Sequence, residues 1–340
     1  MKVLSLFDGI SCGRLALERA GIPVEKYYAS EIDKYAIQVA QKNYPDTIQI
    51  GDCTKIDYKK YAGEIDLLIG GSPCQGFSFA GKQLNFADPR SRLFFEFVRA
   101  LKEVKPKYFL LENVKMKKEF QDIISQQLGV EPIEINSALV SAQNRKRLYW
   151  TNIPNITQPA DKGVLLKDIV HEFREYFQKN QGRLVYEWLN KYIVPFDQTL
   201  QILDKEVAKG KVGYFRKDSQ ANRIYYIHDK AVTLCGDAGG GATKMGQYLF
   251  GCITPDRIEK RQNGQRFNDG TKFYTLTAQD KHGVLVDGYI RKLTPIECER
   301  LQTLPDNYTA GISDSQRYKC LGNGWTVDVI AHILKQIPTE

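Results

Sequence analysis

Short apolar runs that alternate with helix-like stretches over the first 150 residues constrain the fold of this chain more than any other feature. Strand-like runs occupy residues 3–7, 27–30, 48–50, 66–69 and 108–111, and helix-like stretches occupy 14–20, 35–43 and 92–102. Repeated strand–helix units of this length predict a parallel sheet with helices on both faces. We therefore expect an α/β fold built on a Rossmann-like, doubly wound sheet.

Polar or small residues follow these predicted strands. They are Asp8-Gly9, Glu31, Asp52, Pro73-Cys74 and Glu112-Asn113. In doubly wound sheets ligands bind at the carboxyl ends of the strands. We expect these residues, although distant in sequence, to line a single crevice.

The strand–helix alternation stops at about residue 155. A helix is predicted at 184–193, followed by short β-like pieces and the glycine run 239–241, and helical patterns return at 295–301 and 326–334. A length of 340 residues also exceeds what one hydrophobic core usually supports. We expect one domain from residues 1–154 and 275–340, and a smaller, loop-rich domain from 155–274.

One cysteine has a setting that favours nucleophilic chemistry. Cys74 follows Pro73 in a glycine-rich loop directly after a buried strand, with Arg145 and Arg147 among the nearby cations. A cysteine reacts as its thiolate and needs an exposed, electropositive environment. The alternative is an ordinary small, apolar cysteine.

Two other segments carry candidate polar groups. Glu112-Asn113 ends an apolar strand, where a carboxyl group could hold or protonate a polar heterocycle, or simply bind loop amides. The run from Gln143 to Arg147 is basic and could bind phosphate or stabilise charge on a base, although such runs are usually solvated.

Cysteine and histidine usage limits the chemistry further. The seven cysteines and four histidines are scattered, and no C-x-x-C occurs, which argues against a disulfide framework and against a metal site. No apolar run is long enough for a membrane span or a secretory signal, so we expect a cytoplasmic protein with no membrane partner. The net charge of +8 is compatible with a polyanionic partner.

In this order, the motifs resemble those of the DNA cytosine-5 methyltransferases, over residues 1–153 and about 274–335. Pro73-Cys74-Gln75, Glu112-Asn113-Val114 and Gln143-to-Arg147 look like the family's catalytic motifs. Phe7-Asp8-Gly9, Glu31-Ile32, Asp52-Cys53 and Gly322-Asn323 look like its cofactor motifs. The resemblance implies an AdoMet-dependent methyltransferase sheet, with 155–274 as the target-recognition domain.

The resemblance also implies a cofactor and a mechanism. The cofactor would be S-adenosyl-L-methionine (AdoMet), leaving as S-adenosyl-L-homocysteine, without a metal. Its binding residues would be Phe7, Gly9, Ile10, Ser11, Glu31, Ile32, Asp52, Cys53, Pro73 and Asn323. The catalytic residues would be Cys74, Glu112, Asn113, Arg145 and Arg147. Cys74 would add to carbon 6 of a cytosine flipped from a short specific site in double-stranded DNA, and the protein would act as a monomer.

Some residues depart from the family pattern. Ser11 and Cys12 replace two glycines of the first motif, and Ile32 replaces an aromatic residue that often stacks on adenine. Several motifs look closer to vertebrate de novo enzymes, but the chain lacks their large extensions, which favours a compact bacterial or phage modification enzyme.

Other classes of protein fit less well. A tRNA cytosine-5 methyltransferase typically carries Cys-Phe-Thr in its recognition region, and that tripeptide does not occur here. A catalytically silent relative would be expected to lose Cys74 or Glu112. A zinc-dependent deaminase needs Pro-Cys-x-x-Cys, and a Rossmann dehydrogenase leaves both catalytic motifs unexplained.

Overall fold

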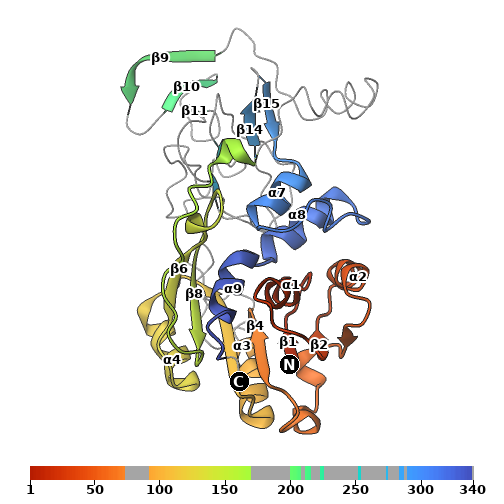
Figure 1. Ribbon diagram of the computed structural model, residues 1–340. Coiled ribbons are helices and arrows are strands. Elements are labelled where there is room, and N and C mark those ends of the chain that lie inside the picture. The colour runs from red at the N-terminus through yellow and green to blue at the C-terminus, as the bar shows by residue number, and fades with distance from the viewer. Residues whose placement is uncertain are drawn as a thin grey trace.

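A seven-stranded sheet forms the centre of the lower part of the molecule (Figure 1). This computed structural model describes residues 1–72, 92–169, 200–207, 211–215, 223–225, 252–253, 273–274, 283–286 and 289–338. The sheet has the order β3-β2-β1-β4-β5-β8-β6. Its strands are β1 (Lys2–Leu6), β2 (Lys26–Ser30), β3 (Ile48–Gln49), β4 (Leu67–Gly70), β5 (Tyr108–Val114), β6 (Ile133–Asn136) and β8 (Lys146–Thr151). The expected α/β class is confirmed.

The five strands that the sequence predicted pair in parallel as expected, and the sheet also contains antiparallel pairs that were not predicted. Strands β1 to β5 pair in parallel, but β8 runs antiparallel to both β5 and β6. The chain between β6 and β8 is short and contains only the turn η3 (Ser137–Leu139) and the two-residue strand β7 (Gln143–Asn144). Such a link is too short for the crossover that a parallel pair needs.

Helices cover both faces of this sheet, as predicted. Their bounds are α1 (Cys12–Arg19), α2 (Lys34–Asn43), α3 (Arg92–Val104), α4 (Lys118–Leu128), α7 (Pro295–Leu301), α8 (Asp314–Asn323) and α9 (Val327–Leu334). Side chains alternate between the faces along a strand. Val3 and Ile69 therefore join the core beneath α1 and α9, while Leu4 and Leu68 join the core beneath α3.

The C-terminal segment packs against the seven-stranded sheet and its helices. Helix α9 packs on α1, and Trp325, Ile330 and Leu334 are buried with Leu15 and Leu17. The return of the chain after residue 292 places the turn between α8 and α9 beside the loop that follows β1. Three-residue or four-residue 3-10 turns complete the connections: η1 (Cys53–Lys55), η2 (Tyr58–Tyr61) and η4 (Leu166–Asp168).

The remaining strands lie above the sheet in Figure 1. β9 (Leu200–Val207), β10 (Lys211–Phe215) and β11 (Arg223–Tyr225) form one antiparallel sheet, and β12 (Cys252–Ile253), β14 (Gly283–Val286) and β15 (Tyr289–Lys292) form another. Strand β13 (Phe273–Tyr274) pairs in parallel with β7. The helix predicted at 184–193 and the glycine run 239–241 lie outside the described residues.

Candidate active site

A cavity of about 490 Å³ lies at the carboxyl ends of β1, β2, β4 and β5. Its size falls within the usual range for small-molecule sites. Of the residues that the structure describes, these line it: Phe7, Gly9, Ile10, Ser30, Glu31, Ile32, Asp33, Ala36, Asp52, Cys53, Gly71, Ser72, Leu93, Glu112, Asn113, Val114, Arg145, Arg147, Lys319, Cys320, Gly322 and Asn323. Among the strand-end residues that the sequence predicted to converge, Gly9, Glu31, Asp52, Glu112 and Asn113 line this cavity. Asp8 does not line it and is buried instead.

The loop between β1 and α1 forms one wall through an unusual backbone. Phe7, Gly9 and Ser11 have φ angles of 56°, 59° and 59°. These angles lie in the left-handed region, which is unfavourable for residues other than glycine. Ser11 is fully buried and does not line the cavity, because its hydroxyl donates a hydrogen bond to the carboxylate of Asp8. Burial raises the pKa of Asp8, although hydrogen bonds from Ser11 and neighbouring hydroxyls oppose that rise.

Glu31 is fixed at the end of β2 by backbone donors. Its Oε2 accepts from the amide of Gly9 at 2.8 Å, and its Oε1 accepts from the amides of Ile32 at 2.7 Å and Asp33 at 2.9 Å. Ile32 is 77% exposed at the cavity edge. An anchored carboxylate next to an exposed aliphatic side chain suits a ligand with hydroxyl groups beside a flat ring.

A second carboxylate follows β3. The backbone amide and hydroxyl of Thr54 donate to Asp52 Oδ1, and the amide contributes most to lowering the pKa of Asp52. Beside it, burial raises the pKa of the Cys53 thiol to about 12, and the same effect raises that of Cys320 to about 12. Both thiols are therefore protonated at neutral pH, so neither of these cavity cysteines is suited to act as a nucleophile.

Helix α8 closes the opposite wall. Lys319 Nζ contacts Asp33 Oδ2 at 2.5 Å, which joins α8 to the start of α2 across the cavity edge. Asp33 also caps α2 by accepting hydrogen bonds from the amides of Tyr35 and Ala36. The sequence reading missed both residues of this ion pair, and the only available signal was an aspartate directly before a helical pattern.

The end of β5 carries the two candidate catalytic groups. Glu112 Oε1 lies 3.0 Å from Arg147 Nε on the antiparallel neighbour β8, and both side chains are about nine-tenths buried. Asn113 donates from Nδ2 to Ser72 Oγ at 3.0 Å and to the Ser72 carbonyl oxygen at 3.4 Å. Asn113 thereby ties the end of β5 to the segment that continues into Pro73 and Cys74. These two residues lie outside the described residues.

Arg145 is directed away from solvent, with 3% of its surface exposed. Its guanidinium donates to the carbonyl oxygens of Gly324 at 2.9 Å and Gly322 at 3.4 Å. These two glycines flank Asn323 at the end of α8. Arg145 therefore lines the cavity and also holds the turn that carries the predicted cofactor residue Asn323.

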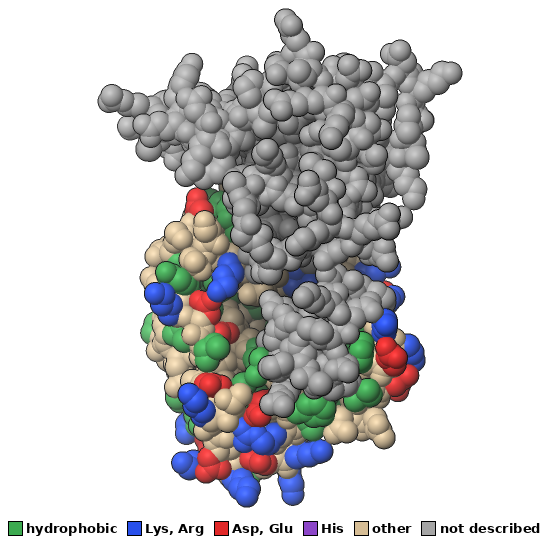
Figure 2. Space-filling model, turned by 180° about the vertical axis from the view of Figure 1, so that it is seen from behind, with side chains coloured by type: hydrophobic (Ala, Val, Ile, Leu, Met, Phe, Trp, Pro, Cys, Tyr) green, Lys and Arg blue, Asp and Glu red, His purple; other side chains and the backbone are tan. Residues whose placement is uncertain are grey.

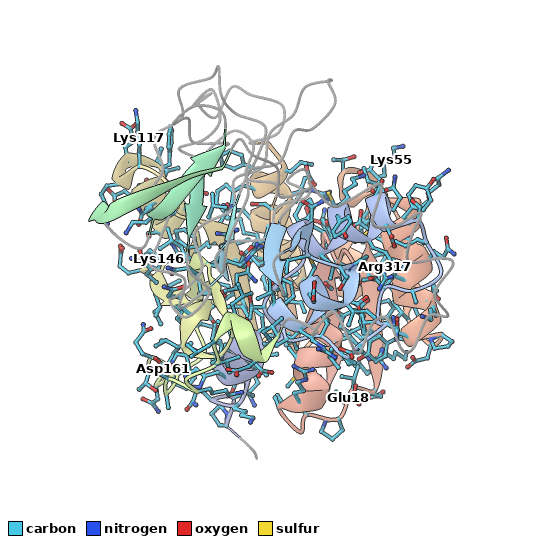
Figure 3. All side chains as sticks on the ribbon, turned by 90° about the horizontal axis from the view of Figure 1, so that it is seen from above. Glu18, Lys55, Lys117, Lys146, Asp161 and Arg317 are labelled. Carbon is cyan, nitrogen blue, oxygen red and sulfur yellow. The ribbon has the colours of Figure 1, made fainter. Side chains whose placement is uncertain are left out.

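Exposed lysines surround the same edge of the sheet. Viewed from above in Figure 3, Lys117 and Lys146 lie on one side and Lys55 on the other, and all three side chains are largely exposed. On the described part of the face shown in Figure 2, cationic and anionic side chains are interspersed and do not gather by sign. Within the described residues, His, Cys, Asp and Glu form no group that could hold a metal ion.

The sheet has the fold of an AdoMet-dependent methyltransferase, and comparisons with known proteins give the family. The family described as C-5 cytosine-specific DNA methylase matches residues 1–339, and the chain belongs to this family. It is a DNA (cytosine-5) methyltransferase, with relatives in phages and bacteria. None of the helices in the described ranges is long and apolar enough to cross a membrane.

Two relatives are similar along almost their whole length. The orphan methyltransferase M.SPRI of Bacillus phage SPR is 32% identical, with 99% of this chain and 97% of that protein covered. The type II methyltransferase M.HhaI of Haemophilus parahaemolyticus is 30% identical, with 99% and 94% covered. Among solved structures, the Entamoeba histolytica methyltransferase EhMeth has the same fold, with a TM-score of 0.64 at 18% identity over 99% of this chain and 97% of that one.

Proposed function

We propose that this enzyme methylates carbon 5 of a cytosine flipped out of double-stranded DNA, through a covalent bond between Cys74 and carbon 6. The observation that carries this proposal is the shared cavity. Glu31 and Asp52 lie on one wall, and Glu112 and the segment leading to Cys74 lie on the other. A methyl donor and a base would therefore occupy one connected space.

The reaction needs a nucleophile because carbon 5 of cytosine is itself a poor one. Addition of the Cys74 thiolate at carbon 6 moves an electron pair to carbon 5 and makes it nucleophilic. Glu112 holds a proton at nitrogen 3 and so stabilises the adduct. After carbon 5 is methylated, loss of its proton re-forms the double bond and expels the thiolate.

The arginines assist this chemistry in different ways. Arg147 fixes the Glu112 carboxylate through the contact between Nε and Oε1, while Arg145 adds positive charge to the buried end of the cavity. Fixed cations in a site that excludes water stabilise developing negative charge more strongly than they would in solution. Asn113 keeps the Cys74 segment in place through Ser72.

The described residues fit the cofactor that the family uses. AdoMet supplies an electrophilic methyl group when bound. Glu31 would hold its ribose hydroxyls and Ile32 would cover its ring, while Asp52 and Cys53 would contact the adenine. Phe7, Gly9, Ile10 and Asn323 would form the walls around it. Gly9 has open space where a Cβ would be, so the backbone can approach a ligand closely.

We also propose that residues 155–274 recognise the DNA sequence and that 1–154 with 275–340 perform catalysis. The pairing between β13 and β7 joins these two parts directly beside Arg145. Exposed lysines at the edge of the sheet that bears the cavity, including Lys55, Lys117 and Lys146, would contact phosphates of the DNA. The protein would bind one short specific site as a monomer.

The test uses AdoMet labelled in its methyl group, duplex DNA of mixed sequence and, separately, tRNA. Wild-type protein is expected to label DNA, Cys74→Ser is expected to lose at least 1,000-fold in rate (about 4 kcal/mol), and Cys298→Ala is the matched control. Cys298 is fully buried in α7, away from the cavity. Label on tRNA alone would reassign the substrate to RNA, and equal loss in both cysteine variants would remove the role proposed for Cys74.

A second experiment isolates the covalent step. DNA that contains 5-fluorocytosine cannot lose a proton from carbon 5, so an adduct with Cys74 would persist after methylation. Wild-type protein with AdoMet is expected to form a protein–DNA complex that survives denaturing electrophoresis. If Cys74→Ser forms the same complex, the proposed covalent bond is wrong.

A further inference from the structure

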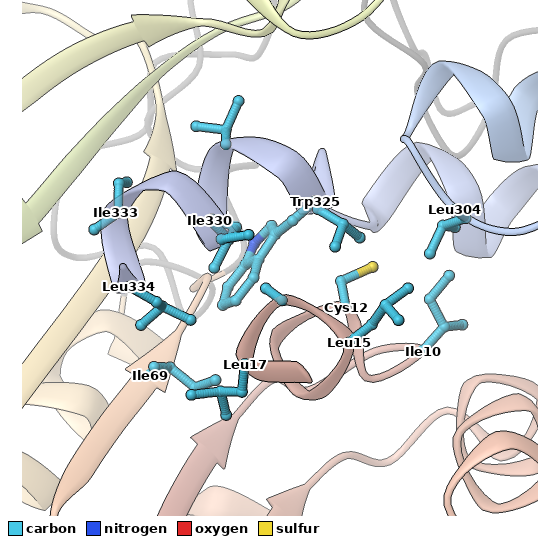
Figure 4. Close-up of a cluster of buried hydrophobic side chains, with 14 of the residues drawn as sticks. Ile10, Cys12, Leu15, Leu17, Ile69, Leu304, Trp325, Ile330, Ile333 and Leu334 are labelled. Carbon is cyan, nitrogen blue, oxygen red and sulfur yellow. The ribbon is translucent and has the colours of Figure 1, made fainter. Parts of the chain in front are cut away.

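Trp325 lies beside the cavity, although it does not line the cavity itself. It is in the α8–α9 turn, two residues after Asn323, and its side chain lies in the core between α9, α1 and β4 (Figure 4). Its backbone amide donates to Cys12 Sγ at the start of α1. The ring therefore lies against both the cofactor loop and the sheet.

Two glycines show how closely the indole ring approaches these segments. A Cβ on Gly13 would lie 3.3 Å from Trp325 Cζ3, and a Cβ on Gly71 would lie 2.8 Å from Trp325 Nε1. The same Cβ on Gly71 would lie 3.1 Å from Glu112 Oε2. The indole ring and the Glu112 carboxylate thus approach the same backbone position, three residues before Cys74.

We propose that Trp325 is a positioning residue that sets where Gly71, and with it the Cys74 segment, lies relative to Glu112 and the cofactor loop. This inference rests on the proposed function, since it concerns the alignment of Cys74 with the base. The edge of the rigid indole ring, at Nε1 and Cζ2, lies against Gly71, where a Cβ would come within 2.8 Å and 3.2 Å of these atoms. The ring therefore determines the position of that backbone within a few tenths of an ångström.

Catalytic geometry is sensitive on this scale. A displacement of about 1 Å costs about 100-fold in rate. Trp325→Phe removes the part of the ring that contains Nε1, and Trp325→Leu removes the flat surface altogether. We expect the single-turnover methylation rate to fall about tenfold in the first variant and about 100-fold in the second. The dissociation constant for AdoMet should change less than threefold, because the proposed cofactor contacts remain.

Trp150 offers a matched control. It is fully buried, whereas Trp325 is 9% exposed, and it lies in the core on the opposite face of the sheet, where its Nε1 donates to Ser125 Oγ at 3.0 Å. Trp150→Phe should lower the melting temperature as much as Trp325→Phe and leave the single-turnover rate within twofold. Equal rate losses in both variants would show that Trp325 acts only through overall stability, which would overturn the proposal.

A pair of substitutions tests the contact directly. Gly71→Ala places a Cβ against Trp325 Nε1 and should lower the rate at least 30-fold in the wild-type background. In Trp325→Phe the ring no longer reaches that position, so the same substitution should cost at least fivefold less. The proposal is wrong if the two effects on rate simply multiply, or if only the melting temperature is rescued.

A third measurement does not depend on methylation. The rate of Cys74 alkylation by iodoacetamide, followed by mass spectrometry against pH, reports the environment of the thiol. We expect the profile to shift in Trp325→Leu and to match wild type in Trp150→Phe. If Trp325→Leu shifts the profile but the wild-type protein methylates neither DNA nor tRNA, the proposed function is contradicted while the positioning role is supported. An unchanged profile in Trp325→Leu would overturn the positioning role.

Discussion

The ion pair between Glu112 and Arg147 gives the sharpest prediction from this site. Its atoms lie 3.0 Å apart and the side chains are only 10% and 12% exposed. Arg147→Met keeps most of the side-chain volume but leaves the carboxylate without its cation. Glu112→Gln keeps the shape and leaves the guanidinium with a neutral partner. The double variant removes both charges. Together with the wild type and the two single variants it forms a double-mutant cycle, which measures the coupling energy of the pair.

The geometry sets the expected magnitude. At 3.0 Å and an effective dielectric constant of about 20, the attraction is about 5.5 kcal/mol. Desolvation of both groups cancels a large part of it, while an unpaired buried charge costs about 3–5 kcal/mol. We therefore expect Arg147→Met to lower the free energy of unfolding by about 3 kcal/mol. The coupling energy of the pair should be about 2 kcal/mol.

Urea unfolding followed by far-UV circular dichroism measures all four proteins without requiring catalysis. Lys115 and Glu134 form a matched control, because they lie 2.7 Å apart but are 55% and 33% exposed. Their coupling should stay below about 0.5 kcal/mol and disappear in about 0.5 M salt. Additivity of the Glu112 and Arg147 effects within about 0.5 kcal/mol would refute the reasoning from burial.

Three further predictions follow from the described contacts. Ile32→Trp should tighten AdoMet binding three- to tenfold by calorimetry, because a ring replaces a 77% exposed aliphatic side chain; unchanged affinity would contradict the assignment of this wall. Ser11→Ala should lower the melting temperature more than Ser11→Gly. Both variants lose the hydrogen bond to Asp8, but only alanine keeps a side chain at a φ of 59°. A larger loss in Ser11→Gly would refute the strain proposed for this backbone position. Burial raises the pKa of Asp33, but the hydrogen bond and charge of Lys319 and the amides of Tyr35 and Ala36 together outweigh it and lower the pKa below 3.8. Asp33 therefore stabilises the fold above that pH, and the melting-temperature difference from Asp33→Asn should close as the pH falls below 3.8; a constant difference would disprove it.

The edge of the sheet at which the cavity lies could be predicted from the sequence. Apolar strands and the polar residues that follow them are patterns of neighbouring residues, so they can be recognised without knowing the fold. Apolar runs that end at Glu31 and Glu112 mark the ends of β2 and β5 to within a few residues. Helices α7 and α9 were also located closely, because α7 begins at the local pattern Thr294-Pro295 with Glu297 and α9 is a short apolar run. These features depend on residues near one another in the chain.

Features set by distant contacts were not predictable in the same way. Helix α8 was missed because its sequence, DSQRYKCLGN, has few apolar residues and little periodicity. The direction of β8 depends on its pairing with β5, which joins residues nearly 40 positions apart. The departure at Ser11 looked like a simple loss of glycine. The structure shows instead a serine whose hydroxyl bonds to Asp8 at a position that glycine would favour.

The basic run from Gln143 to Arg147 shows why a cluster in sequence need not be a cluster in space. Side chains alternate along an extended chain, so Lys146 is exposed while Arg145 and Arg147 face the cavity. Arg147 binds Glu112, but Arg145 binds the carbonyl oxygens at the end of α8, where a cation also complements the helix dipole. The arginine that adds charge at the base site therefore also shapes the turn around Asn323 at the cofactor site. Because the Arg145 side chain contacts both the base site and the turn at the cofactor site, a substitution of Arg145 would change both sites at once.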